Sequence, residues 1–156
     1  MKKSVFILII GIMCVLFCFA APAIFAETTL LEQGSRITIR ANGDRNRIIQ
    51  NAFTTILADS GFEVNINDSD YQLDVNVTIT PLDGGNAPNM KYVRLELNAT
   101  LIDNNGKIVL PYSFSWRDGH INQEGAENRA FREAVRKINN EYSGLLNGIV
   151  TGQPTE

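Results

Sequence analysis

The 156-residue sequence predicts an α+β fold, a two-layer sandwich in which two helices cover one face of a largely antiparallel sheet. Three segments alternate apolar and polar side chains over ten residues or more, as strands with one buried face do. Two other segments repeat apolar residues at the helical period and are long enough to cover that face. Short strands beside the first helix complete an expected element order of β-α-β-β-β-β-α.

The first helix is expected between a short strand and a glycine stop. Residues 36–41 alternate in the manner of a strand, and the turn that follows is rich in Asn, Gly and Asp. Either Asn42 or Asp44 is suited to cap the helix over 45–60, which Gly61 is placed to end. The apolar stripe of this helix consists of Ile48, Ile49, Ala52, Phe53, Ile56 and Leu57.

A second short strand and two long strands come next. The short strand is expected over 62–66, and the first long strand over 71–80 after a turn of Asp and Ser. A long loop rich in Gly, Pro and Asn is expected over 81–90, and the second long strand over 91–102. The turn 103–106 then closes a hairpin, because its Asn-Gly pair is suited to positive φ angles.

The third long strand is expected over 107–118 and the last helix over 123–148. The apolar face of the strand consists of Ile108, Leu110, Tyr112, Phe114 and Trp116. Pro111 lies on the opposite face and has no N–H donor, which places this strand at a sheet edge or puts a bulge there. The helix begins with acidic residues, which suit the positive end of its dipole. Its apolar stripe consists of Ala130, Phe131, Ala134, Val135, Ile138, Tyr142, Leu145, Leu146 and Ile149.

The N-terminus has the pattern of a secretory signal peptide over residues 1–26. Lys2 and Lys3 precede an apolar run, and small residues follow it. Cleavage after Ala26 fits best, and cleavage after Ala23 is the alternative. An uncleaved membrane anchor is disfavoured, because the apolar run is shorter than the roughly 20 residues that span a bilayer. We therefore expect a periplasmic or secreted protein, with a membrane contact only if the signal is retained.

Both cysteines, Cys14 and Cys18, lie inside this signal segment. A lipid-attachment site needs a small residue just before its cysteine, but Met13 and Phe17 occupy those positions. Cleavage would leave a mature chain without cysteine, which excludes disulfides, thiolate zinc sites and cysteine nucleophiles. A lipid anchor is therefore not expected.

The mature chain is expected to consist of an N-terminal lead over 27–35, a single α+β domain over 36–149 and a flexible tail over 150–156. It keeps all 17 acidic residues and 12 of the 14 basic ones, for a net charge of −5. A nucleic-acid partner is excluded by this balance, because such proteins carry a basic surface.

The sequence offers few residues for chemistry. His120 is the only histidine, so a catalytic triad and a histidine zinc site both lack partners. The acidic cluster Asp68, Asp70 and Asp74 lacks the glycine and the distal glutamate of a calcium loop, so a turn is the better interpretation. We expect no enzymatic activity, no cofactor, no metal and no small-molecule ligand. A carboxylate-dependent hydrolase acting on cell-wall or glycan material, with Glu96 and Asp74, stays as an alternative.

A protein partner is expected on the polar face of the sheet or at the 81–90 loop. The residues singled out for this surface are Arg94, Glu96, Arg117, Asn86 and Met90. Long loops in small domains are often binding elements. The polar face of the sheet is exposed and has no predicted catalytic or metal site, so it is available for a partner. The hypothesis is an exported, non-enzymatic module that binds another envelope protein. A structural subunit that assembles through its strand edges is the other alternative.

Three stretches, followed by an Ala-rich closing helix, show a familiar layout: NRIIQNAFTTILADSGFEV, YQLDVNVTITP and RLELNATLIDNNGKIV. This layout, over residues 35–148, resembles the small α/β domains of bacterial envelope proteins. Examples are the amino-terminal domain of TolB, the lipoprotein activators of penicillin-binding proteins and the curli-secretion lipoproteins. The resemblance implies a non-enzymatic envelope role that acts through protein contacts.

Overall fold

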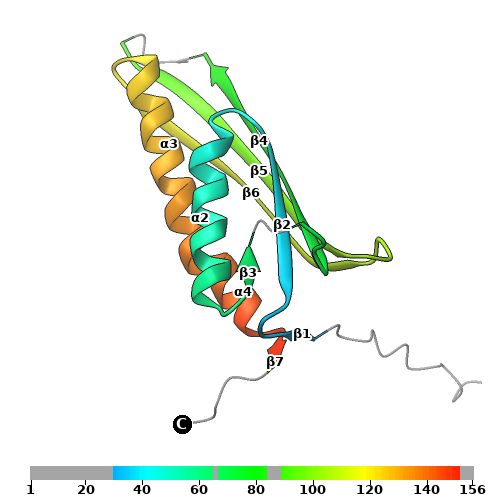
Figure 1. Cartoon of the computed structure of the whole chain (residues 1–156). Helices are drawn as coiled ribbons and strands as arrows, with labels where there is room; N and C mark the ends of the chain where they lie inside the picture. Colours follow the sequence, from blue (N-terminus) through cyan, green and yellow to red (C-terminus); the bar gives the residue numbers. More distant parts are fainter. Residues whose placement is uncertain (1–29, 65–66, 84–88, 152–156) are drawn as a thin grey trace, which may run out of the picture.

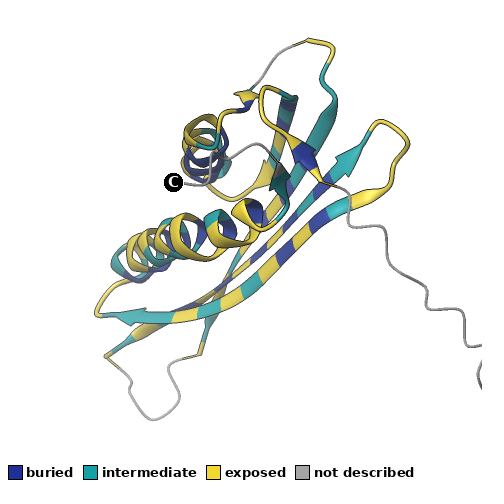
Figure 2. Cartoon of the chain, turned by 90° about the horizontal axis from the view of Figure 1, so that it is seen from below, coloured by how far each residue is buried: buried dark blue, intermediate teal, exposed yellow. Residues whose placement is uncertain are grey.

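Two helical segments pack on one face of a five-stranded sheet in the computed structural model, which describes residues 30–64, 67–83 and 89–151 (Figure 1). Figure 2 shows that the sheet curves around the helices and that its other face is open. The predicted α+β sandwich is therefore confirmed. The expected signal peptide lies outside the described residues. Within those residues, no helix has the length and apolar character needed to cross a membrane.

The main sheet has the strand order β3-β2-β4-β5-β6. Strands β4, β5 and β6 form the expected antiparallel meander, while β2 runs parallel to both β3 and β4. The parallel pairs follow from the helix between β2 and β3, which carries the chain back across the sheet. The elements are β1 (Leu31–Glu32), β2 (Arg36–Gly43), α2 (Asn46–Asp59), β3 (Glu63–Val64), β4 (Tyr71–Leu82), β5 (Lys91–Asp103), β6 (Ile108–His120), α3 (Gln123–Lys137), the π-helical turn η1 (Ile138–Tyr142), α4 (Ser143–Asn147) and β7 (Val150–Thr151).

The core lies between the helices and the inner face of the sheet. The alternation of the long strands buries every second residue, and the stripe of α2 packs onto them. Helix α3 contacts β5 and β6, and α2 contacts β2. Ala126, Ala130 and Ala134 on α3 are fully buried, so this helix approaches the sheet closely.

The start of α2 differs from the expected capping. Neither Asn42 nor Asp44 caps the helix, because Arg45 occupies that position in the left-handed region, with φ 46 and no side-chain cap. The carboxylate of Asp44 instead accepts a hydrogen bond of 2.8 Å from the N–H of Ile79. Its own N–H donates to the carbonyl of Val77 at 3.0 Å. The turn is therefore fastened to β4 rather than to the helix.

Two features of the long strands differ from the sequence prediction. Pro81 and Leu82 belong to β4 and pair with β5, so the expected 81–90 loop is shorter than predicted. A register shift at Leu101 leaves Val109 as an extra residue in β6, which is a bulge. Because one extra residue reverses the alternation before it, Ile108 points away from the core and is 59% exposed. The edge position predicted from the proline is confirmed, since β6 ends the sheet.

The last helix is interrupted by the π-helical turn η1, which the sequence prediction missed. The fully buried residues of this helix recur at a strict spacing of four, and they are Ala126, Ala130, Ala134, Ile138, Tyr142 and Leu146. An α-helix has about 3.6 residues per turn, so such a repeat drifts around its surface. The wider π turn reverses part of that drift and keeps the stripe facing the sheet. Tyr142 is buried there with a hydroxyl that has no hydrogen-bond partner among the described residues.

The lead and tail expected from the sequence contain short strands. β1 and β7 pair in parallel, Leu31 with Val150. Leu31 is fully buried, and its N–H donates to the carbonyl of Ile149 at 2.7 Å. This pairing holds the two described ends of the chain together beside the core.

The ion pair between Arg36 and Asp70 joins the starts of β2 and β4. The guanidinium donates to the carboxylate at 3.0 Å, and the backbone N–H of Arg36 donates to it at 2.9 Å. The hydrogen bond from the Arg36 side chain is the main cause that lowers the pKa of Asp70 below its ordinary value of 3.8. A carboxyl group with a lowered pKa in the folded state stabilises the fold above its ordinary pKa.

Asp70→Asn is therefore expected to lower the urea midpoint of unfolding near neutral pH. The difference in stability from the wild type is expected to shrink as the pH falls below 3.8 and through the lowered pKa. The protonated carboxyl group of Asp70 is then uncharged, as the amide in the variant is at every pH. Urea denaturation followed by circular dichroism across this pH range measures it. A difference that stays constant with pH would show that the carboxylate charge contributes nothing.

Candidate functional site

The open face of the sheet carries rows of polar side chains that run across neighbouring strands. One row contains Arg40, Asp74 and Thr100, and the next contains Asn42, Asn76, Asn98 and Ser113. Residues in register on one face have their Cβ atoms about 5 Å apart, so each row is continuous. Figure 2 shows this face turned away from the helices. The polar face is thus a flat array of hydrogen-bonding groups.

Two of the residues predicted for the partner surface lie directly opposite each other on this face. Arg94 on β5 is in register with Arg117 on β6, and both are exposed. The guanidinium of Arg117 lies over the ring of Tyr92, 4.7 Å from its centroid. Neither arginine makes an ion pair with a described residue. Like charges in directly opposite positions are destabilising, so an anionic group placed between them would relieve the repulsion.

The other predicted surface residues have different positions. Glu96 is exposed on β5, in register with Thr78 and Ser115 and one row from the arginines. Met90 is half-buried just before β5, and Asn86 lies outside the described residues. The structure therefore brings Glu96 beside the arginine pair and leaves Met90 at the end of the sheet.

The outer edge of β6 borders the polar face, and no other described strand pairs with it. Pro111 has no N–H to donate to β5, so its backbone nitrogen lies on the side of β6 that faces away from β5. The N–H of Gly119 donates to the carboxylate of Asp118 at 2.7 Å instead of to a strand. Residues at a spacing of two share one side of a strand, so Ser113, Ser115 and Arg117 present their N–H groups at this edge. The arginine pair thus lies next to a row of backbone N–H groups that face no other described strand.

The carboxylates considered for hydrolysis are far apart. Asp74 is in register with Thr100, whereas Glu96 lies four residues further along the same strand. Four residues of strand span about 13 Å. Paired glycosidase carboxylates are about 5 to 9.5 Å apart. Asp74 also accepts two hydrogen bonds from the side chain of Gln72, at 2.8 and 2.9 Å.

His120 ends β6 and lies against the first turn of α3. Its Nδ1 accepts a long hydrogen bond of 3.4 Å from the N–H of Asn122. The side chain of Asn122 caps α3 by accepting from Gly125 at 2.7 Å. A methyl group on Gly125 would lie 2.1 Å from that imidazole nitrogen, so the glycine makes room for the ring. This contact indicates a packing role. The described residues contain no cluster of three or more potential metal ligands.

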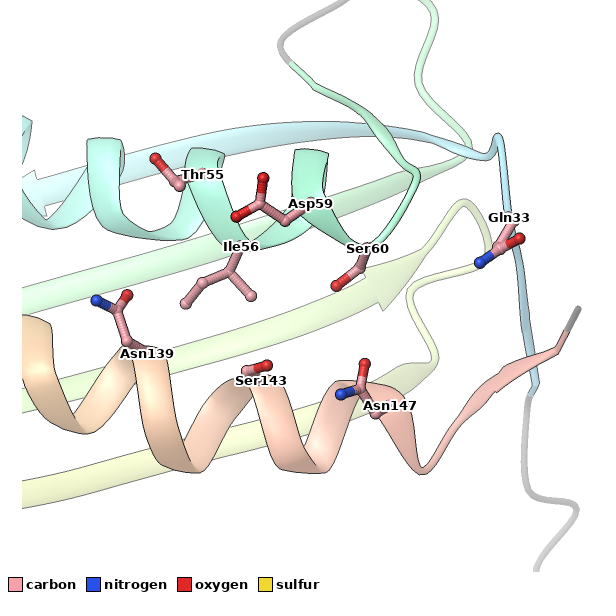
Figure 3. Close-up of a pocket in the computed structure, with 8 residues that line it drawn as sticks. All are labelled: Gln33, Thr55, Ile56, Asp59, Ser60, Asn139, Ser143 and Asn147. Carbon is pink, nitrogen blue, oxygen red and sulfur yellow. The ribbon is translucent and has the colours of Figure 1, made fainter. Parts of the chain in front are cut away.

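A polar groove of about 370 Å³ separates the end of α2 from η1 and α4 (Figure 3). Its lining residues are Gln33, Thr55, Ile56, Asp59, Ser60, Asn139, Ser143 and Asn147. Figure 3 shows Ile56 on α2 and Ser60 just after α2 pointing toward the facing helix, with Gln33 at one end. Amides and hydroxyls dominate, and Asp59 is the only charged residue of this lining. The groove can hydrogen-bond neutral groups, and sequence reasoning missed it because its walls come from three separate segments.

Comparisons with known proteins reveal a shared fold. No protein-family model and no curated protein sequence matches the chain. A candidate lipoprotein from Caulobacter crescentus CB15 has 18% identity and a TM-score of 0.52, and the match covers 72% of this chain and 90% of that one. A minor lipoprotein from Acinetobacter baumannii has 15% identity and a TM-score of 0.53, over 77% of this chain and 97% of that one.

These similarities support the broader part of the resemblance inferred from the sequence. They do not single out TolB, the penicillin-binding-protein activators or the curli-secretion lipoproteins. At such low identity they define the fold alone. The chain is therefore an α+β domain with a fold that bacterial lipoproteins also adopt.

Proposed function

We propose that this chain is an exported module of the bacterial envelope that binds a segment of another protein along the β6 edge. The envelope location is supported by the signal-peptide pattern of the sequence and by the lipoprotein fold of the structural neighbours. The role is binding rather than catalysis. The observation that carries the proposal is the couple Arg94 and Arg117 beside the edge of β6, neither of which makes an ion pair with a described residue.

The partner segment is extended and acidic. Its backbone adds to β6 as a further strand, accepting hydrogen bonds from the N–H groups of Ser113, Ser115 and Arg117. Its carboxylates lie over Arg94 and Arg117, where they remove the repulsion between the two guanidinium groups. Backbone pairing then supplies affinity, and the charges supply the choice of partner.

A photo-crosslinking residue at Ser115 tests this proposal in the source bacterium. We expect a crosslinked protein from Ser115, identified by mass spectrometry, and none from the same probe at Thr78 on β4. With the purified partner, Arg94→Glu combined with Arg117→Glu is expected to weaken binding about tenfold or more. Arg40→Glu, on the same face but at β2, is the matched control and is expected to change affinity by less than about twofold.

Three outcomes count against the proposal. Equal crosslinking from Ser115 and Thr78 would exclude the edge as the docking site. Equal affinity of the wild type and the double variant would exclude the arginine pair. A crosslink from Ser115 to a second copy of the chain, together with an oligomer in light scattering, would favour the structural-subunit alternative.

A further inference from the structure

An apolar hollow of about 380 Å³ lies between α2 and α3, in the layer opposite the polar face. Its apolar lining comes from Ile48 on α2 and from Phe131 and Val135 on α3. Ile48 is 43% exposed, although it belongs to the apolar side of an otherwise well-covered helix. Apolar surface left open in a concave site is typical of ligand pockets.

One wall of this hollow is a residue in a strained conformation. Arg45 adopts φ 46, a region that side-chain-bearing residues rarely occupy. Its guanidinium lies 5.3 Å from the ring centroid of Phe131 and 3.1 Å from the carboxylate of Glu127. It also donates to the side chain of Asn128. Strained backbone persists where surrounding contacts hold it, and it is concentrated at functional sites.

Arg132 lies at the rim of this hollow and also lines a second, charged hollow of about 290 Å³. The other cations of the second hollow are paired. Arg129 contacts Asp118 at 3.1 Å, and Arg136 contacts Glu133 through several hydrogen bonds. Arg132 makes no ion pair with any described residue. Arg132, which is exposed, therefore lines both hollows and has no ion-pair partner among the described residues.

We propose that the apolar hollow, with Arg132 in its lining, binds a free aliphatic monoanion of the fatty-acid type. The chain lies against Ile48, Phe131 and Val135, and the carboxylate head accepts hydrogen bonds from Arg132. The two acids of the second hollow pair with Arg129 and Arg136, so Arg132 is left with one positive charge for a head group with one negative charge. An anionic membrane surface is the poorer occupant, because the local excess is one charge and the mature chain carries a net −5. The proposal does not rest on the β6 edge.

Three probes with the same eight-carbon chain separate the contributions of head and tail. Octanoate, octanamide and octylammonium have anionic, neutral and cationic head groups, and their binding is followed by NMR shifts of backbone amides. We expect octanoate to bind and to shift amides of residues 45–48 and 128–135. Octanamide is expected to bind about tenfold more weakly and octylammonium more weakly still. Hexanoate is expected to lose about twofold to fourfold per methylene removed.

Two variants make the test specific. Arg132→Gln is expected to weaken octanoate binding about tenfold and octanamide binding by less than about threefold, because the hydrogen bond from the guanidinium is charge-assisted only with the carboxylate. Arg40→Gln, on the opposite face of the sheet, is the matched control and is expected to bind octanoate like the wild type. Val135→Asp is expected to abolish binding of all three probes, with amide spectra confirming that the variant is folded.

The proposal fails if octanamide binds as tightly as octanoate, or if Arg132→Gln leaves the octanoate affinity unchanged. It also fails if all the amides that octanoate shifts lie outside the two hollows. Co-sedimentation with phosphatidylglycerol vesicles that requires Arg132, without octanoate binding, would assign the site to a membrane surface instead. A peptide that occupies the hollow while octanoate does not would assign it to a protein partner.

Discussion

Gly43→Ala is expected to lower the free energy of unfolding by about 4 kcal/mol. Gly43 has φ 92, which an alanine adopts only with strain, and a Cβ atom there would lie 1.9 Å from the carbonyl oxygen of Val77. That oxygen accepts the N–H of Asp44, so β4 cannot move aside without breaking the bond that fastens the turn. Urea denaturation followed by circular dichroism measures the loss.

Gly106→Ala is the matched control for Gly43→Ala. Gly106 has a similar φ of 78, but no atom lies within 4 Å of the position that its Cβ would take. Its replacement therefore costs about 1 kcal/mol, the backbone strain alone. Equal losses for the two variants would contradict the steric explanation and would mean that the turn moves freely away from β4.

Phe53→Ala is expected to cost about 4 kcal/mol of stability. Phe53 is fully buried at the centre of α2, and its ring meets that of Tyr142 edge-on with centroids 4.9 Å apart. Removing the ring leaves a cavity between the helices and also removes an aromatic pair worth about 1 kcal/mol. Thermal and urea unfolding of the purified variant both report this loss.

Thr55→Ala tests whether the loss at Phe53 comes from packing. Thr55 is exposed on the same helix, and its hydroxyl donates to the carbonyl of Asn51 within that helix. Its replacement is expected to change stability by less than about 0.5 kcal/mol. A loss below about 1 kcal/mol for Phe53→Ala would show that the two helices do not share a close-packed core.

The long elements were predictable because each has a clear local period. The alternation of β4 and β5 and the stripe of α2 follow from single segments, and tertiary packing preserves them. Gly61 ends α2 with φ 86, as its position predicted. In the hairpin after β5, however, only Gly106 of the expected Asn-Gly pair has a positive φ.

The irregular features were not predictable from the same patterns. The bulge at Val109 depends on register with β5, which no property of β6 alone determines. The π turn has a signal in the strict spacing of four, but the same spacing is also compatible with an ordinary helical stripe. Arg45 was not expected in the left-handed region, because its conformation depends on contacts with α3.

The candidate surfaces also have one part that the sequence predicts and another that depends on tertiary structure. The polar face and its residues Arg94 and Arg117 were predicted, since strand alternation places both on one side. Their direct opposition was not, because it depends on the register between β5 and β6. The apolar hollow needs α2 and α3 placed side by side, and the charged hollow needs the end of β6 beside α3, which a single sequence does not specify.

The pairing of β1 with β7 has a consequence for the topology of the chain. It brings residues 31 and 150 into register, so the path of the backbone nearly closes on itself at one corner of the molecule (Figure 1). A peptide bridge there would join residues 31 and 150 of the described chain into a ring. New termini could then open at the exposed turn 103–106, where no element is interrupted. The order of the elements along the chain is thus separable from their arrangement in space.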